Sequence, residues 1–224
     1  MKPSLKRGIK FYNQKRYQQA KKELLSLDEK PEENPDLAYY LGLCFTQLQE
    51  YEEAITNLEQ AILSHTNLFH IFQCRMVLGY IYSVTGRFAQ AEKEFKSLLK
   101  LKVISPQIYA SVGYTLYAQK KIGESIKNLE KAIKLKPDYP SVLNNLGFIY
   151  AEEELDYNKA IEFCKKAIKL KPGNPAYLDS LGWAYFKKGN IMDAKAHLRK
   201  ALELSKGKKA IATHLKQVLK AAEE

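Results

Sequence analysis

Hydrophobic residues recur at spacings of three and four through most of the chain, with polar residues between them, and this period predicts amphipathic helices. Four prolines stand where the first turn of a helix tolerates a missing N–H: Pro35, Pro106, Pro140 and Pro175. Asn34, Ser105 and Asn174 precede three of them and are candidate N-caps. Residues 85–87 and 188–190 each contain a glycine that interrupts the pattern, as expected of a tight turn between antiparallel helices. The pattern predicts an all-α chain built from helix pairs.

A column of glycines shows that the pairs repeat along the chain. Its members, separated by 34, 37, 34, 34 and 35 residues, are Gly8, Gly42, Gly79, Gly113, Gly147 and Gly182. A column of small residues follows each glycine by twelve or thirteen positions: Ala20, Ala54, Ala91, Ser125, Ala160 and Ala194. Because these residues lack bulk beyond Cβ, we expect the two helices of one pair to approach each other closely at these positions. A period of this length is typical of helical repeat proteins.

Two segments carry a resemblance to a known family. Leu181-Gly182-Trp183-Ala184-Tyr185 with Ala194, Leu198 and Ala201, and Leu146-Gly147-Phe148-Ile149-Tyr150 with Ala160, Ala167 and Pro172, resemble tetratricopeptide repeats (TPRs). The resemblance spans residues 1 to about 206 as six copies. It implies a right-handed α-solenoid of six helix hairpins. The sequence departs from the pattern at Arg7, which replaces an apolar residue, at three extra residues around 65–69, and at one extra residue near 156–158.

The period also predicts the domain organisation. The expected units are a degenerate first repeat at 1–34, repeats at 35–71, 72–105, 106–139, 140–174 and 175–207, and a C-terminal helix at 208–224. Ile211, Leu215, Val218 and Leu219 form one apolar stripe on that last segment. Since a repeat array exposes the apolar face of its last unit, we expect this helix to cap the stack.

The first helix of each pair has one stripe of residues that includes neither the glycine nor the other residues expected to pack against the second helix. It comprises the residues three before, one after and four after each glycine, which share one side of a helix. The family resemblance implies that first helices line the concave wall of the solenoid. We therefore expect a groove that binds a peptide or helical segment of another protein, with these partner-binding residues: Tyr39, Tyr40, Leu43, Tyr80, Tyr114, Tyr117, Asn144, Asn145, Phe148, Trp183 and Phe186. Alternatively, the aromatic residues fill gaps between neighbouring first helices, and the two asparagines are ordinary solvated surface.

Charge supplies two rival interpretations. The 224 residues include 36 Lys and Arg against 25 Asp and Glu, for a net charge of +11, yet residues 31–90 carry −5. The second helices are rich in bases: Lys127, Lys131, Lys134, Lys165, Lys166, Lys169, Lys195, Arg199 and Lys200. A basic nucleic-acid-associated protein is one alternative, although a solvated face explains bases spaced by four, and no specific nucleic acid is expected. Self-association of acidic and basic repeats is the other.

Catalytic and metal-binding motifs are missing from the sequence. Its four histidines are scattered, it contains no HExxH, Cys-x-x-Cys or GxSxG motif, and the acidic run Glu152-Glu153-Glu154 is expected to be a solvated cluster. We therefore expect a non-enzymatic adaptor without a cofactor or metal. The spacing of Cys44, Cys74 and Cys164 indicates reduced core thiols. No segment is apolar enough for membrane insertion, and the expected location is cytoplasmic, or periplasmic or lipid-anchored if a signal segment was removed.

Overall fold

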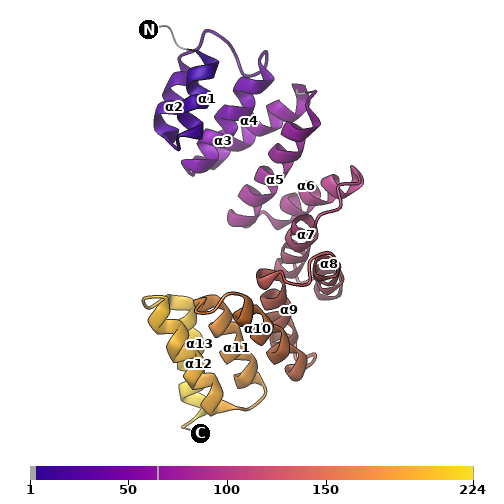
Figure 1. Ribbon diagram of the computed structural model, residues 1–224, viewed down its shortest axis with the longest axis vertical. Coiled ribbons are helices and arrows are strands. Elements are labelled where there is room, and N and C mark those ends of the chain that lie inside the picture. Colours follow the sequence, from indigo (N-terminus) through magenta and orange to yellow (C-terminus); the bar gives the residue numbers. More distant parts are fainter. Residues whose placement is uncertain (1–3, 65, 224) are drawn as a thin grey trace. The chain divides into compact units, whose positions relative to one another are not determined.

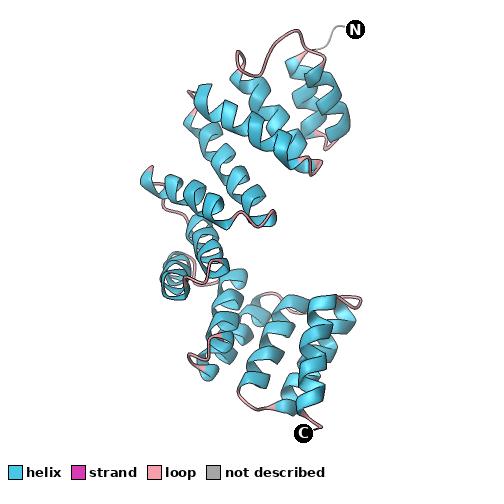
Figure 2. Ribbon diagram, turned by 180° about the vertical axis from the view of Figure 1, so that it is seen from behind, coloured by secondary structure: helices cyan, strands magenta, loops and turns pink. Residues whose placement is uncertain are grey.

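The computed structural model describes residues 4–64 and 66–223, so that His65, one of the extra residues, lies outside the described part. Within these ranges the chain forms thirteen α-helices and no strand, as Figure 2 shows. The expected all-α, solenoid-type fold is confirmed. The helices group into two compact units, unit 1 (Met1–Ile104) and unit 2 (Ser105–Glu224).

Unit 1 contains three helix hairpins, visible in Figure 1. Its helices are α1 (Leu5–Asn13), α2 (Tyr17–Leu25), α3 (Pro35–Gln47), α4 (Tyr51–Ser64), α5 (Leu68–Val84) and α6 (Phe88–Lys100). Each odd-numbered helix packs against the helix that follows it. In addition α3 contacts α1, α2 and α5, so that neighbouring hairpins share a core.

Unit 2 contains three more hairpins and a final helix. Its helices are α7 (Pro106–Ala118), α8 (Ile122–Leu135), α9 (Pro140–Glu152), α10 (Tyr157–Leu170), α11 (Pro175–Lys187), α12 (Ile191–Leu204) and α13 (Lys209–Ala221). The last helix packs on α12 and α11. Its Ile211, Leu215 and Val218 are buried together with Leu198 and Ala201 of α12.

The helix boundaries follow from local chemistry. The side-chain oxygens of Asn34 and Asn174 accept hydrogen bonds of 3.0 Å from backbone N–H groups in the first turns of α3 and α11, and Ser105 caps α7 in the same way. Gly86 and Gly189 adopt φ of 76° and 89° in the turns after α5 and α11. Glycine takes this left-handed conformation without the steric cost that a Cβ atom imposes. The N-caps and turns expected from the sequence are therefore present.

The glycine column marks the closest approach of the two helices in a hairpin. A Cβ atom added to Gly113 would lie 2.7 Å from Cγ of Leu129. One added to Gly147 would lie 2.9 Å from the carbonyl oxygen of Ala160 and closer still to Sγ of Cys164. No real Cβ approaches another atom so closely. The glycines therefore allow the interhelical packing that the sequence predicts.

Arg7, which departs from the repeat pattern, forms an ion pair within the first hairpin. Its Nε lies 2.7 Å from Oε1 of Glu23 and its second terminal nitrogen 2.6 Å from Oε2, which makes a two-pronged pair between α1 and α2. Hydrogen bonding to Arg7 lowers the pKa of the Glu23 carboxyl. The pair joins the two helices at a position where the other repeats have Leu or Val in place of Arg7.

The three extra residues lengthen one helix. α5 has 17 residues, whereas α3, α7, α9 and α11 have 13 each. The other four begin seven residues before their glycine, but α5 begins at Leu68, eleven before Gly79. The extra turn is formed by residues 68–71. The repeat boundary expected between residues 71 and 72 consequently falls inside α5.

Candidate functional site

A pocket of about 190 Å³ lies between the first helices α7 and α9 of unit 2. It is lined by Tyr114, Tyr117, Leu129, Asn144, Asn145, Phe148 and Ile149. Five of these seven residues belong to the expected partner-binding set, and they come together although 34 residues separate the first from the last. The two helices place them side by side because Tyr114, Tyr117, Asn144 and Phe148 lie on the stripe that the interhelical packing leaves unused, and Asn145 lies next to it. The pocket combines aromatic walls with two carboxamide side chains.

Asn144 is the unusual member of this pocket. Its residue is only 9% exposed, and its Oδ1 is buried without a hydrogen-bond partner among the described residues. Buried polar atoms nearly always have a partner, and an unpaired one lowers stability by about 1–3 kcal/mol. The only other side-chain atom of this kind in the described part is Oδ1 of Asn57 in α4. Oδ1 of Asn144 is therefore a buried acceptor without a partner among the described residues, on a side chain that lines a largely apolar pocket.

The Tyr117 side chain forms one wall of the pocket. Its ring meets Phe148 edge to face, with centroids 6.3 Å apart, and Nζ of Lys120 lies 5.7 Å from its centroid. Burial, reinforced by Glu153 and Glu152, raises the pKa of Tyr117 to about 12. The phenol is thus neutral at physiological pH and keeps its proton. Tyr114, about half exposed, lies nearer to solvent.

Three further residues of the expected set lie together in unit 1. Tyr39, Tyr40 and Leu43 of α3 line a cavity of about 590 Å³ with residues of α1 and α5. Tyr80 of α5 lies in an adjoining pocket of about 380 Å³, with Met76 and Val77. Among these, Tyr39 is buried and its ring stacks on His70 at 4.3 Å.

Trp183 and Phe186 of α11 are not among the lining residues of these pockets. The indole of Trp183 is 8% exposed, and His214 of α13 stacks on it at 4.4 Å. Its Nε1–H donates a 2.7 Å hydrogen bond to Oε2 of Glu152. Phe186 packs against the same indole at 5.2 Å. The surroundings of Trp183 thus match the alternative in which this ring fills a gap between helices.

The acidic run at the end of α9 is more than a solvated cluster. Glu152 accepts the hydrogen bond from Trp183, and Oε1 of Glu154 pairs with Nζ of Lys187 at 2.9 Å. Both contacts join α9 or its following turn to α11. The Glu154 side chain is 61% exposed and therefore solvated as expected, whereas Glu152 is only partly exposed and is hydrogen-bonded to the neighbouring first helix.

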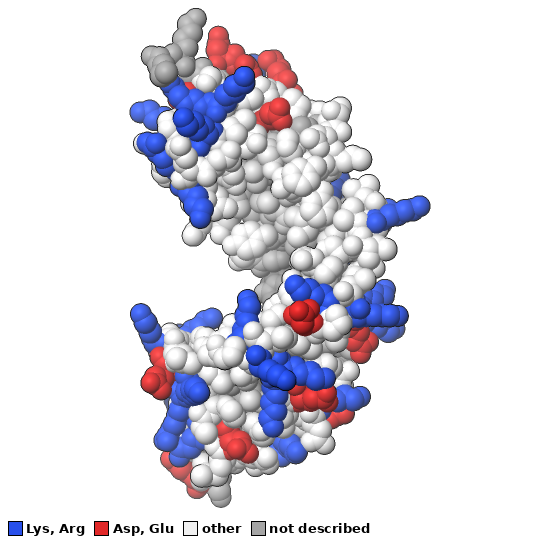
Figure 3. Space-filling view, viewed as in Figure 1, with Lys and Arg blue, Asp and Glu red and all other residues white. Residues whose placement is uncertain are grey.

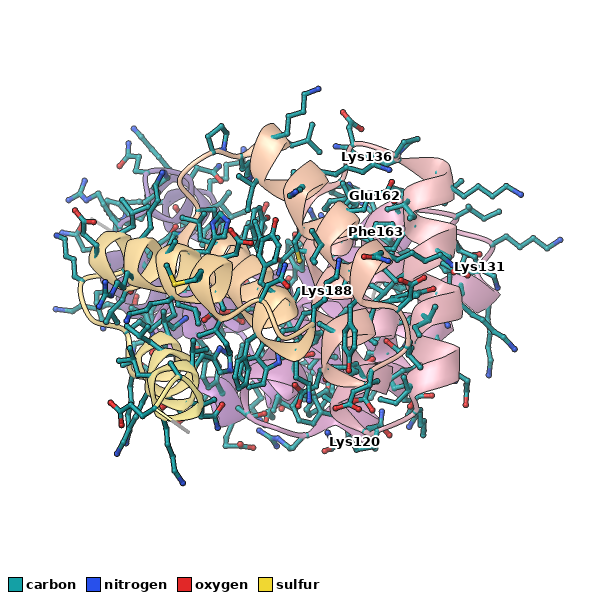
Figure 4. The ribbon with its side chains drawn as sticks, turned by 90° about the horizontal axis from the view of Figure 1, so that it is seen from below. Lys120, Lys131, Lys136, Glu162, Phe163 and Lys188 are labelled. Atoms are coloured by element: carbon teal, nitrogen blue, oxygen red, sulfur yellow. The ribbon has the colours of Figure 1, made fainter. Side chains whose placement is uncertain are left out.

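Many lysines on and next to the second helices of unit 2 already contact neighbouring side chains. Nζ of Lys131 and Nζ of Lys136 each lie 5.5 Å from a tyrosine ring centroid, Tyr109 and Tyr139 respectively. Lys166 pairs with Glu162 at 2.6 Å. Figure 4 labels Lys131, Lys136 and Glu162 among the side chains of unit 2. These lysines pack on rings and carboxylates of their own unit, as expected of a solvated helix face.

Four ring-bearing residues that line the 590 Å³ cavity of unit 1 are absent from the set expected from the sequence. They are Tyr12 of α1 and Phe69, His70 and Phe72 of α5. Tyr12 belongs to the same stripe as the expected residues, four positions after Gly8, so the period alone could have identified it. The other three lie on or beside the extra turn of α5. The three-residue insertion was the signal for them, but its conformation could not be deduced from the repeat pattern.

Helix hairpins joined by tight turns and packed side by side define a helical repeat protein. Family models described as tetratricopeptide repeat match residues 5–66 and residues 140–174 and 176–208, and a TPR repeat model matches residues 113–153. The chain belongs to the tetratricopeptide repeat family. Repeats of this family build protein–protein interaction scaffolds, and the chain is of that class.

The curated relatives share only part of their length with this chain. BBSome complex member BBS4 of Bos taurus is 26% identical over 132 residues, which are 58% of this chain and 24% of that protein. Protein O-mannosyl-transferase TMTC3 of Homo sapiens is 29% identical over 135 residues, 59% of this chain and 15% of that protein. The chain thus spans a quarter or less of the length of either relative.

Solved structures show the same fold at low identity. A chain of the APC/C hetero-tetramer Cut9-Hcn1 is 18% identical with a TM-score of 0.76, and the match covers 96% of this chain and 42% of that one. YrrB, described as a TPR protein with an unusual peptide-binding site, is 17% identical with a TM-score of 0.62. The match covers 90% of this chain and 97% of that one. Among the described residues, no helix combines the length and apolarity that a membrane crossing requires.

Proposed function

We propose that the chain is a non-catalytic adaptor, and that the pocket between α7 and α9 binds an extended peptide segment of another protein. An apolar side chain of the segment enters between Tyr114, Tyr117 and Phe148. The Asn144 carboxamide turns toward the segment, so that its Oδ1, buried in the unbound chain, accepts a hydrogen bond from a backbone N–H. Tyrosine rings suit this role because they offer large, stiff contact area at a small entropic cost.

The unpaired acceptor of Asn144 carries the proposal. A peptide supplies one N–H donor at nearly every residue, so an extended segment can satisfy the acceptor whatever its sequence. The pocket volume of about 190 Å³ matches one side chain rather than a whole small ligand. The description of YrrB as peptide-binding supports this class of ligand for the fold, and the details rest on the residues of this chain.

The test measures peptide binding by the intact chain. Twelve-residue peptides are selected on the protein by phage display, and the tightest binder is labelled with fluorescein for anisotropy titration. We expect Tyr114→Ala combined with Tyr117→Ala to weaken binding by about a hundredfold, because two aromatic anchors are lost. Asn144→Leu should weaken it about tenfold, the loss of one buried hydrogen bond.

Asn57→Leu is the matched control for Asn144→Leu. It removes the other buried, unpaired amide oxygen of the described part, which lies outside the pocket. Circular dichroism confirms that each variant is folded. If the selected peptides bind the double tyrosine variant and the Asn144 variant as tightly as the original chain, the pocket is not a peptide site and the proposal fails.

A further inference from the structure

The extra turn of α5 places apolar and aromatic side chains where the other first helices have none. Phe69 is 62% exposed and Leu68 is still more exposed, although both begin a helix whose 17 residues include a single Lys, Arg, Asp or Glu, Arg75. A helix that is apolar on nearly all sides is normally buried. The open side of α5 is therefore an exposed apolar surface of the kind that marks interaction sites.

The extra turn also forms one wall of the 590 Å³ cavity in unit 1. His70 stacks on Tyr39, whose ring meets Tyr40 at 4.9 Å, and Tyr40 in turn meets Tyr12 of α1 at 5.9 Å. Three tyrosines and a histidine thus form a continuous aromatic surface across α1, α3 and α5. No Lys, Arg, Asp or Glu is among the described residues that line the cavity.

The tyrosines of this surface are neutral. Burial raises the pKa of Tyr12 to about 12 and also raises the pKa values of Tyr39 and Tyr40. Neutral phenol rings present the electron-rich faces that attract a cation, and the attraction grows when the cation loses water. The cavity is therefore suited to a positively charged side chain.

One carboxylate, that of Asp36, lies next to the cavity, and further acidic residues come shortly before it in the chain. The loop before α3 and the first turn of α3 contain Asp28, Glu29, Glu32, Glu33 and Asp36 against a single base, Lys30. Oδ1 of Asp36 lies 3.6 Å from Nδ1 of His70, and its charge contributes to the raised pKa of Tyr40, so this carboxylate is next to the aromatic surface. Figure 3 shows acidic side chains along the upper edge of unit 1 and a broad area free of charged side chains below them.

We propose that the cavity beneath the extra turn of α5 is a second docking site, which takes an Arg or Lys side chain from a segment of a partner protein. The cation lies against the rings of Tyr12 and Tyr40, near the carboxylate of Asp36. Apolar residues of the same segment lie along Phe69, Phe72 and Met76, which share one side of α5 because their spacings are three and four. The site lies within unit 1 and is independent of the peptide pocket proposed for unit 2.

Charge complementarity distinguishes this partner from other occupants. Residues 31–90 carry −5, whereas unit 1 as a whole carries 15 Lys and Arg against 12 Asp and Glu, or +3, and the whole chain carries +11. The chain as a whole therefore repels a basic peptide and attracts an acidic one, so a preference for the basic peptide has to come from the local site. Because the net charge of the chain opposes binding of a basic peptide, tighter binding of a basic peptide than of a neutral one would test the proposed site directly.

The experiment uses three fluorescein-labelled dodecapeptides of Gly and Leu that differ only at two positions, which hold Arg, Gln or Glu. They are titrated against the intact chain at physiological salt. We expect the Arg peptide to bind about ten times more tightly than the Gln peptide, and the Glu peptide to bind most weakly. Tyr40→Leu, Phe69→Ser and Asp36→Asn should each weaken binding of the Arg peptide, by about three- to tenfold.

Two control variants show whether binding of the Arg peptide depends on this cavity. Leu63→Ser removes another exposed apolar side chain of unit 1, on α4 and outside the cavity, and should leave binding unchanged. Asn144→Leu alters the pocket of unit 2 and should also leave it unchanged, so failure of one site is distinguishable from failure of the other. Phe69 is largely exposed, so its replacement should not unfold the chain.

Three results would overturn the proposal. One is equal binding of the Arg and Gln peptides. Another is undiminished binding of the Arg peptide to both Tyr40→Leu and Phe69→Ser, or a loss that occurs in Asn144→Leu instead. The third is a dimer of the original chain in analytical ultracentrifugation that Phe69→Ser dissociates, because this would assign the surface to a second copy of the chain.

Discussion

The imidazole of His214 in α13 stacks on the indole of Trp183 in α11, with ring centroids 4.4 Å apart and planes inclined by 23°. Nδ1 of the same imidazole lies 2.9 Å from Oδ1 of Asp179, one turn before Trp183 on α11. The final helix is therefore held by a polar and aromatic contact to the first helix of the last hairpin, in addition to its apolar contact with α12.

Replacing His214 by Ala should loosen α13 and expose the indole. We expect a loss of about 1–2 kcal/mol in stability, from one stacked ring pair and one hydrogen bond to a carboxylate. Trp183 is the chain's single Trp, so its fluorescence reports directly on this contact. The emission maximum should shift to longer wavelength and the melting temperature should fall. An unchanged emission spectrum would show that His214 does not cover the indole in solution.

Asn144→Leu should stabilise the chain while it weakens peptide binding. Leu has the same branched shape as Asn and leaves no unpaired polar atom, so we expect the free energy of unfolding to rise by about 1 kcal/mol. Urea unfolding monitored by circular dichroism measures the change. A destabilised variant would indicate that Oδ1 of Asn144 has a partner within the folded chain, and the acceptor would then be closed to a ligand.

Alanine substitutions at two glycines should have opposite effects. Gly147→Ala forces a Cβ against Cys164 and the backbone of Ala160, and overpacking of this kind lowers stability by about 1–3 kcal/mol. Gly123→Ala places a Cβ in open space within α8 and should raise stability, by up to about 1 kcal/mol. Thermal melting of both variants checks the pair. Equal melting temperatures would contradict the role given to the glycine column.

Stability should fall as the pH drops below neutrality, in part through His197. Its ring stacks on Tyr185 at 5.5 Å, and burial lowers its pKa below the usual 6.5, with Asp193 opposing the shift and Lys165 and Lys200 adding to it. The unfolded chain therefore takes up this proton at a higher pH than the folded chain does, and stability is lost from about pH 6.5 downward.

The test compares the pH dependence of the melting temperature of the original chain with that of His197→Gln. We expect the melting temperature of the variant to decline less between pH 7.5 and 5.5, since the other histidines are common to both proteins. A parallel decline in the two proteins would rule out a contribution from His197.

The helices, caps and glycine contacts follow from the sequence because each depends on residues close together in the chain or on the repeat period. The grouping of Tyr114, Tyr117, Asn144, Asn145 and Phe148 follows in the same way, since neighbouring hairpins pack in register. The covering of Trp183 does not follow, because it depends on the position that α13 takes on α11. The wall formed by Phe69 and His70 was also missed, since an insertion can form either a loop or an added helical turn.

The extra turn of α5 begins well before the contact between Gly79 and Phe95, where α5 and α6 pack most closely. An insertion at this point therefore alters what the hairpin presents to other molecules and leaves the spacing of its two helices intact. Lengthening a first helix at its start is thus a way for a repeat to acquire a new recognition surface without rebuilding its core.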